Sequence, residues 1–244
     1  MALGDTATPL YKILIDGKSC QGDSLEWSLP RDGQPGEWQE HVGELRLCSA
    51  GLHVTDDPAQ WWQPHCTVYL AEAEGVVGRC ADAANRKAVA RRVRLMREAP
   101  RDELAALHIY LEGIVRAPTS GMVIASGSAT VEAYGSATVE AYGSATVRAY
   151  GSATVRAYDS ATVEASDSAT VEASGSATVE AYDSATVEAS GSATVVSRWG
   201  SPVVRLIERQ RGVHLDRRSG ALHIYSADGE WSPPIPREEG DAGR

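Results

Sequence analysis

The chain has 244 residues, with 23 Lys and Arg against 33 Asp and Glu, a formal net charge of −10 and no Phe. This charge argues against nucleic-acid binding through the whole surface. The first residues lack the basic and apolar segments of a secretory signal, and no apolar run approaches the roughly 18 residues needed to span a membrane. We therefore expect a cytoplasmic protein without a membrane partner.

The four cysteines contain no CxxC pair and no second pair at zinc-ribbon spacing. Neither a structural metal site nor a disulfide framework is indicated. We expect no metal and no cofactor, and reduced thiols at Cys20, Cys48, Cys66 and Cys80.

After an N-terminal tail at residues 1–8, the mixed composition of residues 9–118 predicts a small α/β globular domain. Alternating apolar residues predict strands at Leu10–Asp16, Leu45–Cys48, Thr67–Glu74 and Val93–Met96. Helices are predicted after Asp57-Pro58, over Ala81–Arg92 and, on a stripe of three leucines, over Arg101–Ile114. A single longer helix through Met96 also fits the second pattern.

A motif within this domain resembles a known family. The stretch LRLCSAGLHVTDDPAQWW from Leu45 to Trp62, followed by TVYLAEAEG from Thr67 to Gly75, is similar to an uncharacterised domain family of bacteria and phages. The resemblance covers roughly residues 10–115. It implies an architecture and no activity, because that family is a domain of unknown function.

The same Gly-Leu-His turn, aromatic helix and strand also resemble, in order, ADP-ribosyltransferase-like folds. That resemblance implies an NAD site at His53, Trp61, Trp62 and Tyr69. No catalytic glutamate can be placed, and Tyr11-Lys12 stands where such enzymes carry a His or Arg on their first strand. The alternative is that the tryptophans belong to the core and the histidine is a structural hydrogen-bonding group.

Basic residues gather near the end of this domain. The sequence places no aromatic residues among these basic residues to stack on bases. We therefore expect a solvated face, or a contact to the Glu columns of the repeats described below, rather than a nucleic-acid site. The cluster comprises Arg86, Lys87, Arg91, Arg92, Arg94, Arg97 and Arg101.

Residues 119–198 form an array of octads. Nine octads, most of the form Gly/Asp-Ser-Ala-Thr-Val-Glu/Arg-Ala-Tyr/Ser, run from Gly127 to Arg198, and a degenerate tenth precedes them. An even period with strict alternation predicts one strand and one corner per octad. Ala129, Val131 and Ala133 then share the inward face, and the Gly or Asp supplies the corner.

Such repeats bury their apolar face by stacking into a β-solenoid. Two octads, 16 residues, per coil suit the narrow Ala–Val–Ala core better than three, which would leave voids. In this register Thr130 stacks on Thr146 and Thr138 on Thr154, about 4.8 Å apart. Ten octads give five coils, in which each Arg of the charged columns lies between two Glu.

The AYGSATVE and AYDSATVE units resemble the octapeptides of bacterial ice-nucleation proteins, which also pair into 16-residue β-solenoid coils. That resemblance implies a water-ordering rank of hydroxyls. Neighbouring charged columns and the short array count against it. The residues of the rank are Ser128, Thr130, Thr138, Thr146 and Thr154.

Tyrosines gather at the predicted corners, where an exposed aromatic strip would suit a protein partner or a second copy of the chain. Packing within the corner is the alternative. These tyrosines are Tyr134, Tyr142, Tyr150, Tyr158 and Tyr182.

Residues 199–232 abandon the octad and predict a β cap over the open end of the solenoid, built from strands at Val203–Ile207, Val213–Asp216 and Ala221–Tyr225. The polar tail at 233–244 is predicted to be disordered.

The predicted fold is mainly β, with a small α/β N-terminal domain, a β-solenoid of octapeptide repeats and a β cap. Our first hypothesis is a non-catalytic structural or interaction protein that self-associates, with a dimer favoured. An ice-binding solenoid and an NAD-dependent transferase remain the alternatives.

Overall fold

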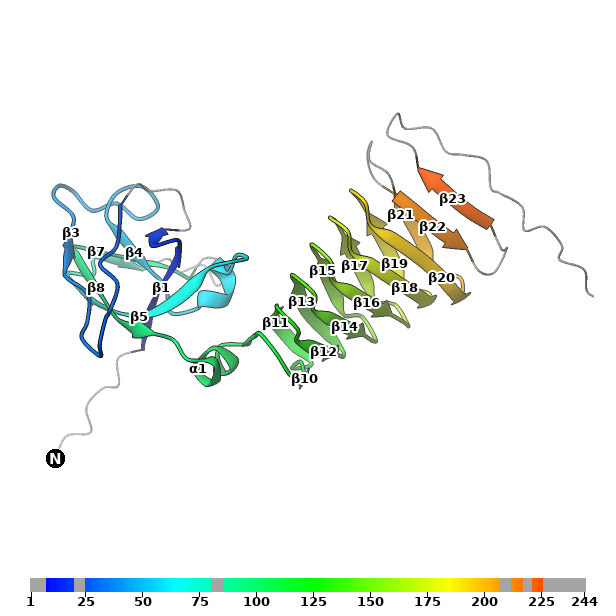
Figure 1. Cartoon of the computed structure of the whole chain (residues 1–244), viewed down its shortest axis with the longest axis horizontal. Helices are drawn as coiled ribbons and strands as arrows, with labels where there is room; N and C mark the ends of the chain where they lie inside the picture. Colours follow the sequence, from blue (N-terminus) through cyan, green and yellow to red (C-terminus); the bar gives the residue numbers. More distant parts are fainter. Residues whose placement is uncertain (1–7, 20–24, 80–85, 207–211, 217–220, 226–244) are drawn as a thin grey trace, which may run out of the picture. The chain divides into compact units, whose positions relative to one another are not determined.

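The computed structural model describes residues 8–19, 25–79, 86–206, 212–216 and 221–225. It is mainly β, with 51% strand and 5% helix, which confirms the predicted fold class. The chain divides into two compact units, Met1–Leu107 and His108–Arg244 (Figure 1).

The N-terminal unit is built on two antiparallel sheets. One has five strands in the order β2-β1-β5-β8-β3 and the other has three in the order β4-β7-β6. The strands are β1 (Leu10–Ile15), β2 (Lys18–Ser19), β3 (Gln39–Glu40), β4 (Leu52–Val54), β5 (Thr67–Glu74), β6 (Gly78–Arg79), β7 (Ala88–Ala90) and β8 (Arg92–Glu98).

The core of this unit is assembled from residues far apart in the sequence. Leu14 from β1, Trp27 from a connecting segment and Leu95 from β8 are all buried in one cluster. The four central residues of β1 are buried on both of its faces, and Lys12 is one of them. A strand covered on both sides requires its charged group to find polar partners.

Helix is scarce in the unit, and two of the three predicted helices differ from the structure. A 3₁₀ helix, η1 (Pro58–Trp61), starts at a proline as predicted, whereas α1 (Arg101–Ala106) is shorter than expected. His108 follows it in the left-handed region at φ 61°, which ends the helix, and the next residues pair into the solenoid.

The other differences lie in short segments. Within the predicted helix over 81–92, residues 88–90 form β7, paired on both sides by β4 and β6, while 81–85 lie outside the described residues. The predicted strand at Leu45–Cys48 is a turn in which Cys48 has φ 69°. Pairing to neighbouring strands overrides the local pattern here.

The second unit is a β-solenoid of about six turns over residues 109–206, with about 16 residues per turn. Figure 1 shows its strands stacked in two ranks. An eight-stranded sheet holds β10 (Ile114–Arg116), β12 (Thr130–Ala133), β14 (Thr146–Ala149), β16 (Thr162–Ala165), β18 (Thr178–Asp183), β20 (Thr194–Gly200), β22 (Gly212–Asp216) and β23 (Ala221–Tyr225).

The facing seven-stranded sheet holds β9 (Ile109–Tyr110), β11 (Ser120–Ala125), β13 (Ser136–Ala141), β15 (Thr154–Ala157), β17 (Thr170–Ala173), β19 (Thr186–Ala189) and β21 (Val203–Leu206). Thr130 pairs with Thr146 and Thr138 with Thr154, which confirms two octads per coil. Ala129, Val131 and Ala133, with their equivalents along the array, form the continuous core between the sheets and are fully buried.

The corners use backbone that favours glycine. Gly135 has φ 64°, and a Cβ there would lie 2.8 Å from the Thr119 carbonyl oxygen. Asp159 occupies the equivalent corner position at φ 54°, and its Oδ2 accepts a hydrogen bond from the backbone N–H of Gly143 at 3.1 Å. Aspartate therefore replaces glycine by bonding to the corner of the preceding coil.

The solenoid extends beyond both predicted boundaries, 119 and 198. Ile114 pairs with Thr130, so residues without a recognisable octad still enter the ladder. At the other end β21 and β22 continue the two parallel stacks, and only β23 is antiparallel. The five predicted coils become about six turns. The tail at 233–244, most of the tail at 1–8 and the last residues of the predicted cap lie outside the described residues.

Candidate functional site

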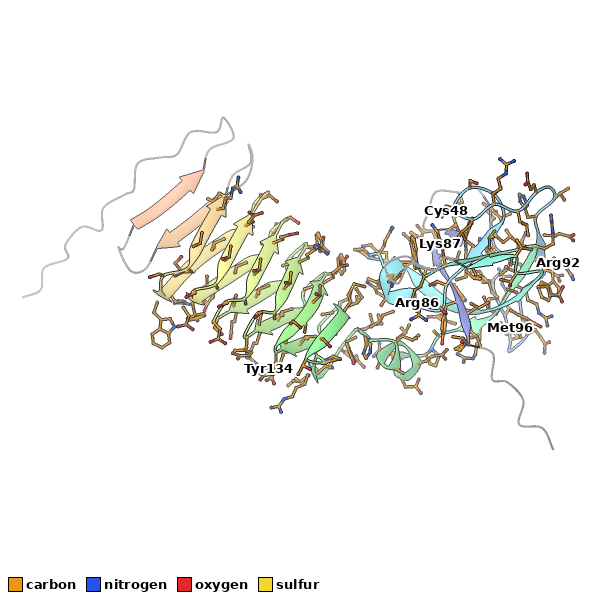
Figure 2. The ribbon with its side chains drawn as sticks, turned by 180° about the vertical axis from the view of Figure 1, so that it is seen from behind. Cys48, Arg86, Lys87, Arg92, Met96 and Tyr134 are labelled. Atoms are coloured by element: carbon orange, nitrogen blue, oxygen red, sulfur yellow. The ribbon has the colours of Figure 1, made fainter. Side chains whose placement is uncertain are left out.

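A pocket of about 260 Å³ in the N-terminal unit brings together two of the four residues predicted for the NAD site. His53 and Trp61 line it, together with residues of β1, of the turn before β4 and of the segment before β7. Cys48 and Lys87, labelled in Figure 2, belong to the same lining. The full lining is Tyr11, Lys12, Ile13, Ser19, Cys48, Ser49, Gly51, His53, Val54, Thr55, Trp61 and Lys87.

The other two predicted residues do not line this pocket. Trp62 is 8% exposed and Tyr69 is 9% exposed. Tyr69 instead borders a second hollow with Leu29 and Met96, and its burial raises the pKa of its hydroxyl. The pocket therefore brings together His53 and Trp61 and leaves Trp62 and Tyr69 outside its lining.

His53 holds the wall of the pocket in place. Its Nε2 accepts a hydrogen bond from the backbone N–H of Cys48 at 3.0 Å, which fixes the left-handed turn before β4. Its carbonyl oxygen accepts a hydrogen bond from Nζ of Lys12 at 3.2 Å. A ring nitrogen that accepts a hydrogen bond from a backbone N–H carries no proton to donate, so this bond commits the Nε2 atom of His53 to holding the turn.

Sequence reasoning missed the two lysines of the pocket. Lys12 is 7% exposed in the structure. The sequence signal for a buried lysine was its place in the otherwise apolar run LYKILI. Lys87 had been assigned only to the basic cluster. Its Nζ lies 4.8 Å from the centroid of the Trp61 ring, a contact that sequence spacing does not reveal.

Most of the basic cluster is neutralised by carboxylates of its own unit. Ion pairs join Arg86 to Asp56 at 3.0 Å, Arg92 to Glu74 at 2.6 Å, Arg94 to Glu72 at 2.5 Å and Arg97 to Glu103 at 2.7 Å. The structure also supplies an aromatic partner that the sequence did not suggest. The guanidinium groups of Arg92 and Arg94 lie 4.6 and 4.8 Å from the centroid of Trp38.

The hydroxyl rank on the solenoid is narrower than predicted. Ser128 lies in the turn before β12 and is exposed, whereas the strand itself begins at Thr130. Thr130 and Thr146 stand on the eight-stranded sheet, and Thr138 and Thr154 on the seven-stranded sheet. Each of these four strands thus presents a Thr and, two residues later, a Glu or Arg on the same outward face.

The charged residues form ladders along both sheets. On the eight-stranded sheet Arg116 pairs with Glu132 at 3.1 Å and Arg148 with Glu164 at 3.3 Å. On the other sheet Arg156 lies between Glu140 at 3.4 Å and Glu172 at 3.2 Å.

The corner tyrosines stack on one another between coils. The ring centroids are 5.0 Å apart for Tyr134 and Tyr150 and 4.9 Å apart for Tyr142 and Tyr158. Tyr142 donates a hydrogen bond to Glu140 at 2.8 Å, and burial together with this bond raises the pKa of the Tyr142 hydroxyl. Tyr134, labelled in Figure 2, is the most accessible of the four at 37%.

A second aromatic contact lies further along the solenoid. Tyr182 meets Trp199 edge to face at 6.1 Å, and Trp199 is 69% exposed. Trp199 lies one residue beyond the octads, and Ser166 separates this contact from the stacked rings of Tyr134 and Tyr150 in the corner column.

Comparison of the chain with protein-family models, curated proteins and solved structures found no match. Within the described residues, no cluster of three or more His, Cys, Asp or Glu is arranged to hold a metal ion. No helix in that part of the chain has the length and apolar character required to cross a lipid bilayer.

Proposed function

We propose that the chain is a non-catalytic interaction protein whose solenoid is a rigid spacer and a docking surface for a second copy. The observation that carries this proposal is the parallel ladder of the eight-stranded sheet, in which one register links β10, β12, β14, β16 and β18, and β20 as far as Ser197, over a buried core. A ladder of this kind presents equivalent side chains at a fixed spacing of about 4.8 Å.

The outward charges of the eight-stranded sheet are self-complementary. Arg116, Glu132, Arg148, Glu164 and Glu180 occupy successive positions of one column, and the first four form the complementary set. Because β10 is the first strand of this sheet, the symmetry described next places no residue of the column opposite Glu180. A two-fold axis midway between Glu132 and Arg148 would bring Arg116 opposite the partner's Glu164 and Glu132 opposite the partner's Arg148. All four contacts that this symmetry generates are attractive, as an isologous interface requires.

The seven-stranded sheet fits a second copy less well. Its column reads Glu140, Arg156, Glu172, Glu188 and Arg205. The best two-fold axis passes through Glu172 and leaves two like carboxylates face to face. The eight-stranded sheet also carries Ile114, which is 79% exposed beside the charged column. These features support the eight-stranded sheet as the contact.

Sedimentation velocity of the full chain over a range of concentrations tests the proposal. We expect a discrete dimer that weakens at high salt, because the pairing charges are solvent-exposed. Arg148→Glu should give a monomer, and Glu132→Arg combined with Arg148→Glu should restore the dimer. Arg156→Glu is the matched control, since it makes the same charge change at the equivalent place on the other sheet and should leave the dimer intact.

A lateral contact through the tyrosine corners is the competing arrangement. In that case Tyr142→Ser with Tyr158→Ser would weaken the dimer and Arg148→Glu would not. A monomer at every concentration would contradict self-association. Fibres that lengthen with concentration would contradict a closed two-fold contact and indicate pairing through the open ends of the solenoid.

A further inference from the structure

The pocket of the N-terminal unit is lined by positive charge. Among the described residues its lining includes two lysines, Lys12 and Lys87, and no Asp or Glu. The neighbouring Asp56 points both carboxylate oxygens at Arg86, each at 3.0 Å. A concave surface that carries cations alone concentrates anions.

Lys12 supplies a fixed charge in the wall of this pocket. Its Nζ donates hydrogen bonds to Ser19 Oγ at 2.5 Å and to the His53 carbonyl oxygen at 3.2 Å, and it lies 4.8 Å from the centroid of Trp27. Because the residue is almost fully buried, solvent screens this charge less than it screens a surface lysine.

Lys87 supplies an adjustable charge. In the described part of the chain its ammonium contacts the face of Trp61 rather than a carboxylate, and its side chain is half-buried. An exposed cation–π contact contributes only about 0.5–1 kcal/mol, so a bound anion can draw the ammonium toward itself. Trp61 also offers the pocket a flat apolar surface.

The volume limits the ligand. At about 260 Å³ the pocket lies just below the roughly 300–1,000 Å³ typical of drug-sized sites. Two ammonium groups match a dianion better than the single charge of a carboxylate. A phosphate monoester has a second pKa near 6 and is mostly dianionic at neutral pH.

We infer that the pocket binds a small phosphate monoester, with its phosphoryl group between Lys12 and Lys87 and its organic group against Trp61. The site is separate from the proposed docking surface and does not depend on it. The turn before β4 adds Cys48 and Ser49 to the wall of the pocket, and the hydrogen bond from the Cys48 N–H to His53 holds this turn in place.

Isothermal titration of the full chain with phenyl phosphate at low salt tests this site. We expect saturable one-to-one binding, weaker binding of inorganic phosphate and no binding of phenol. Lys87→Gln should weaken phenyl phosphate binding about tenfold or more, the loss expected when a charge-assisted contact is removed. Lys18→Gln is the matched control, because Lys18 is an exposed lysine of β2 that does not line the pocket. This variant should bind phenyl phosphate with the affinity of the wild type.

Trp61→Leu distinguishes the contribution of the phenyl group from that of the phosphoryl group. It should reduce the affinity for phenyl phosphate to that for inorganic phosphate. Absence of saturable binding, unchanged binding in Lys87→Gln, or an equal loss in Lys87→Gln and Lys18→Gln would each overturn the inference. The last of these results would mean that the protein attracts phosphate through its general surface charge.

Discussion

The two units bury apolar surface in opposite ways. The solenoid repeats Ala, Val and Ala at equivalent places, and each side chain packs on its copy in the next coil. The N-terminal unit fits unlike side chains such as Leu14, Trp27 and Leu95 together once. Repetition gives a narrow, filled core with regular outer faces, whereas irregular packing leaves a concave pocket with converging polar groups. The first arrangement suits a docking surface, and the second suits a small ligand.

The largest effect is expected from a charge placed in the repeated core. Val147 is fully buried between the two sheets, so Val147→Asp leaves a carboxylate without a partner in an apolar layer. We expect a loss of unfolding free energy on the order of 4 kcal/mol. Thr146→Asp, one residue away on the outward face, is the control and should change stability by no more than about 1 kcal/mol. Chemical denaturation checks both, and unchanged stability of Val147→Asp would show that this face is not the core.

A cavity made in the core of the N-terminal unit should lower the stability of that unit and leave the stability of the solenoid unchanged. Leu95 is fully buried, and Leu95→Ala is expected to cost the N-terminal unit about 2–5 kcal/mol. Met96→Ala, at the half-buried neighbouring position labelled in Figure 2, should cost clearly less. Hydrogen exchange measured by peptide mass should show lost protection in β1, β5 and β8 and unchanged protection in the solenoid. Equal loss in both would mean that the two units unfold as one.

The same contrast explains what the sequence could and could not predict. The octad indicates where each strand lies, which side chains face inward and how many residues form a coil. The pairing of Thr130 with Thr146 therefore followed from the period of the repeat and the width of the core alone. Ile114 pairs into the same ladder without the octad, and for that reason the boundary at 119 was wrong. In the N-terminal unit, β7 forms because β4 and β6 flank it, and these contacts have no local signature.

The candidate sites follow this division. The outward columns of the solenoid could be predicted by register, including the positions of Arg148 and Arg156. The pocket could not be predicted, since Lys12 and Lys87 come to line the same pocket only after separate segments of the chain have packed together. The prediction of His53 in a turn was wrong, because the residue lies in β4 and pairs with Val89. Its hydrogen bond to Cys48 depends on a left-handed residue at a position where the sequence predicts a strand.

A buried tyrosine should make the stability of the N-terminal unit fall in alkali. Burial, and then the hydrogen bond that its hydroxyl donates to Glu103 at 2.9 Å, raise the pKa of Tyr11 from 10 to about 12. The folded state therefore holds this proton more tightly than the unfolded state. The resulting stability is fully present below pH 10 and is lost as the pH rises from about 10 to 12. Urea midpoints followed by tryptophan fluorescence at pH 9, 10 and 11 should fall less steeply in Tyr11→Phe, and an identical slope would contradict this assignment.

The smallest effect is expected on the charged ladders, where many ion pairs contribute little each. Arg156 lies between Glu140 and Glu172 on the seven-stranded sheet, with about two-fifths of its side chain exposed. Exposed pairs contribute about 0.2–1 kcal/mol each, so the loss of both pairs in Arg156→Ala should lower stability by about 0.4–2 kcal/mol, and the difference should shrink in 1 M NaCl. Arg156→Lys keeps the charge and should lose less than Arg156→Ala. A loss as large as that of Leu95→Ala, unaffected by salt, would mean that the ladder stabilises the solenoid through packing of the arginine stem rather than through its charge.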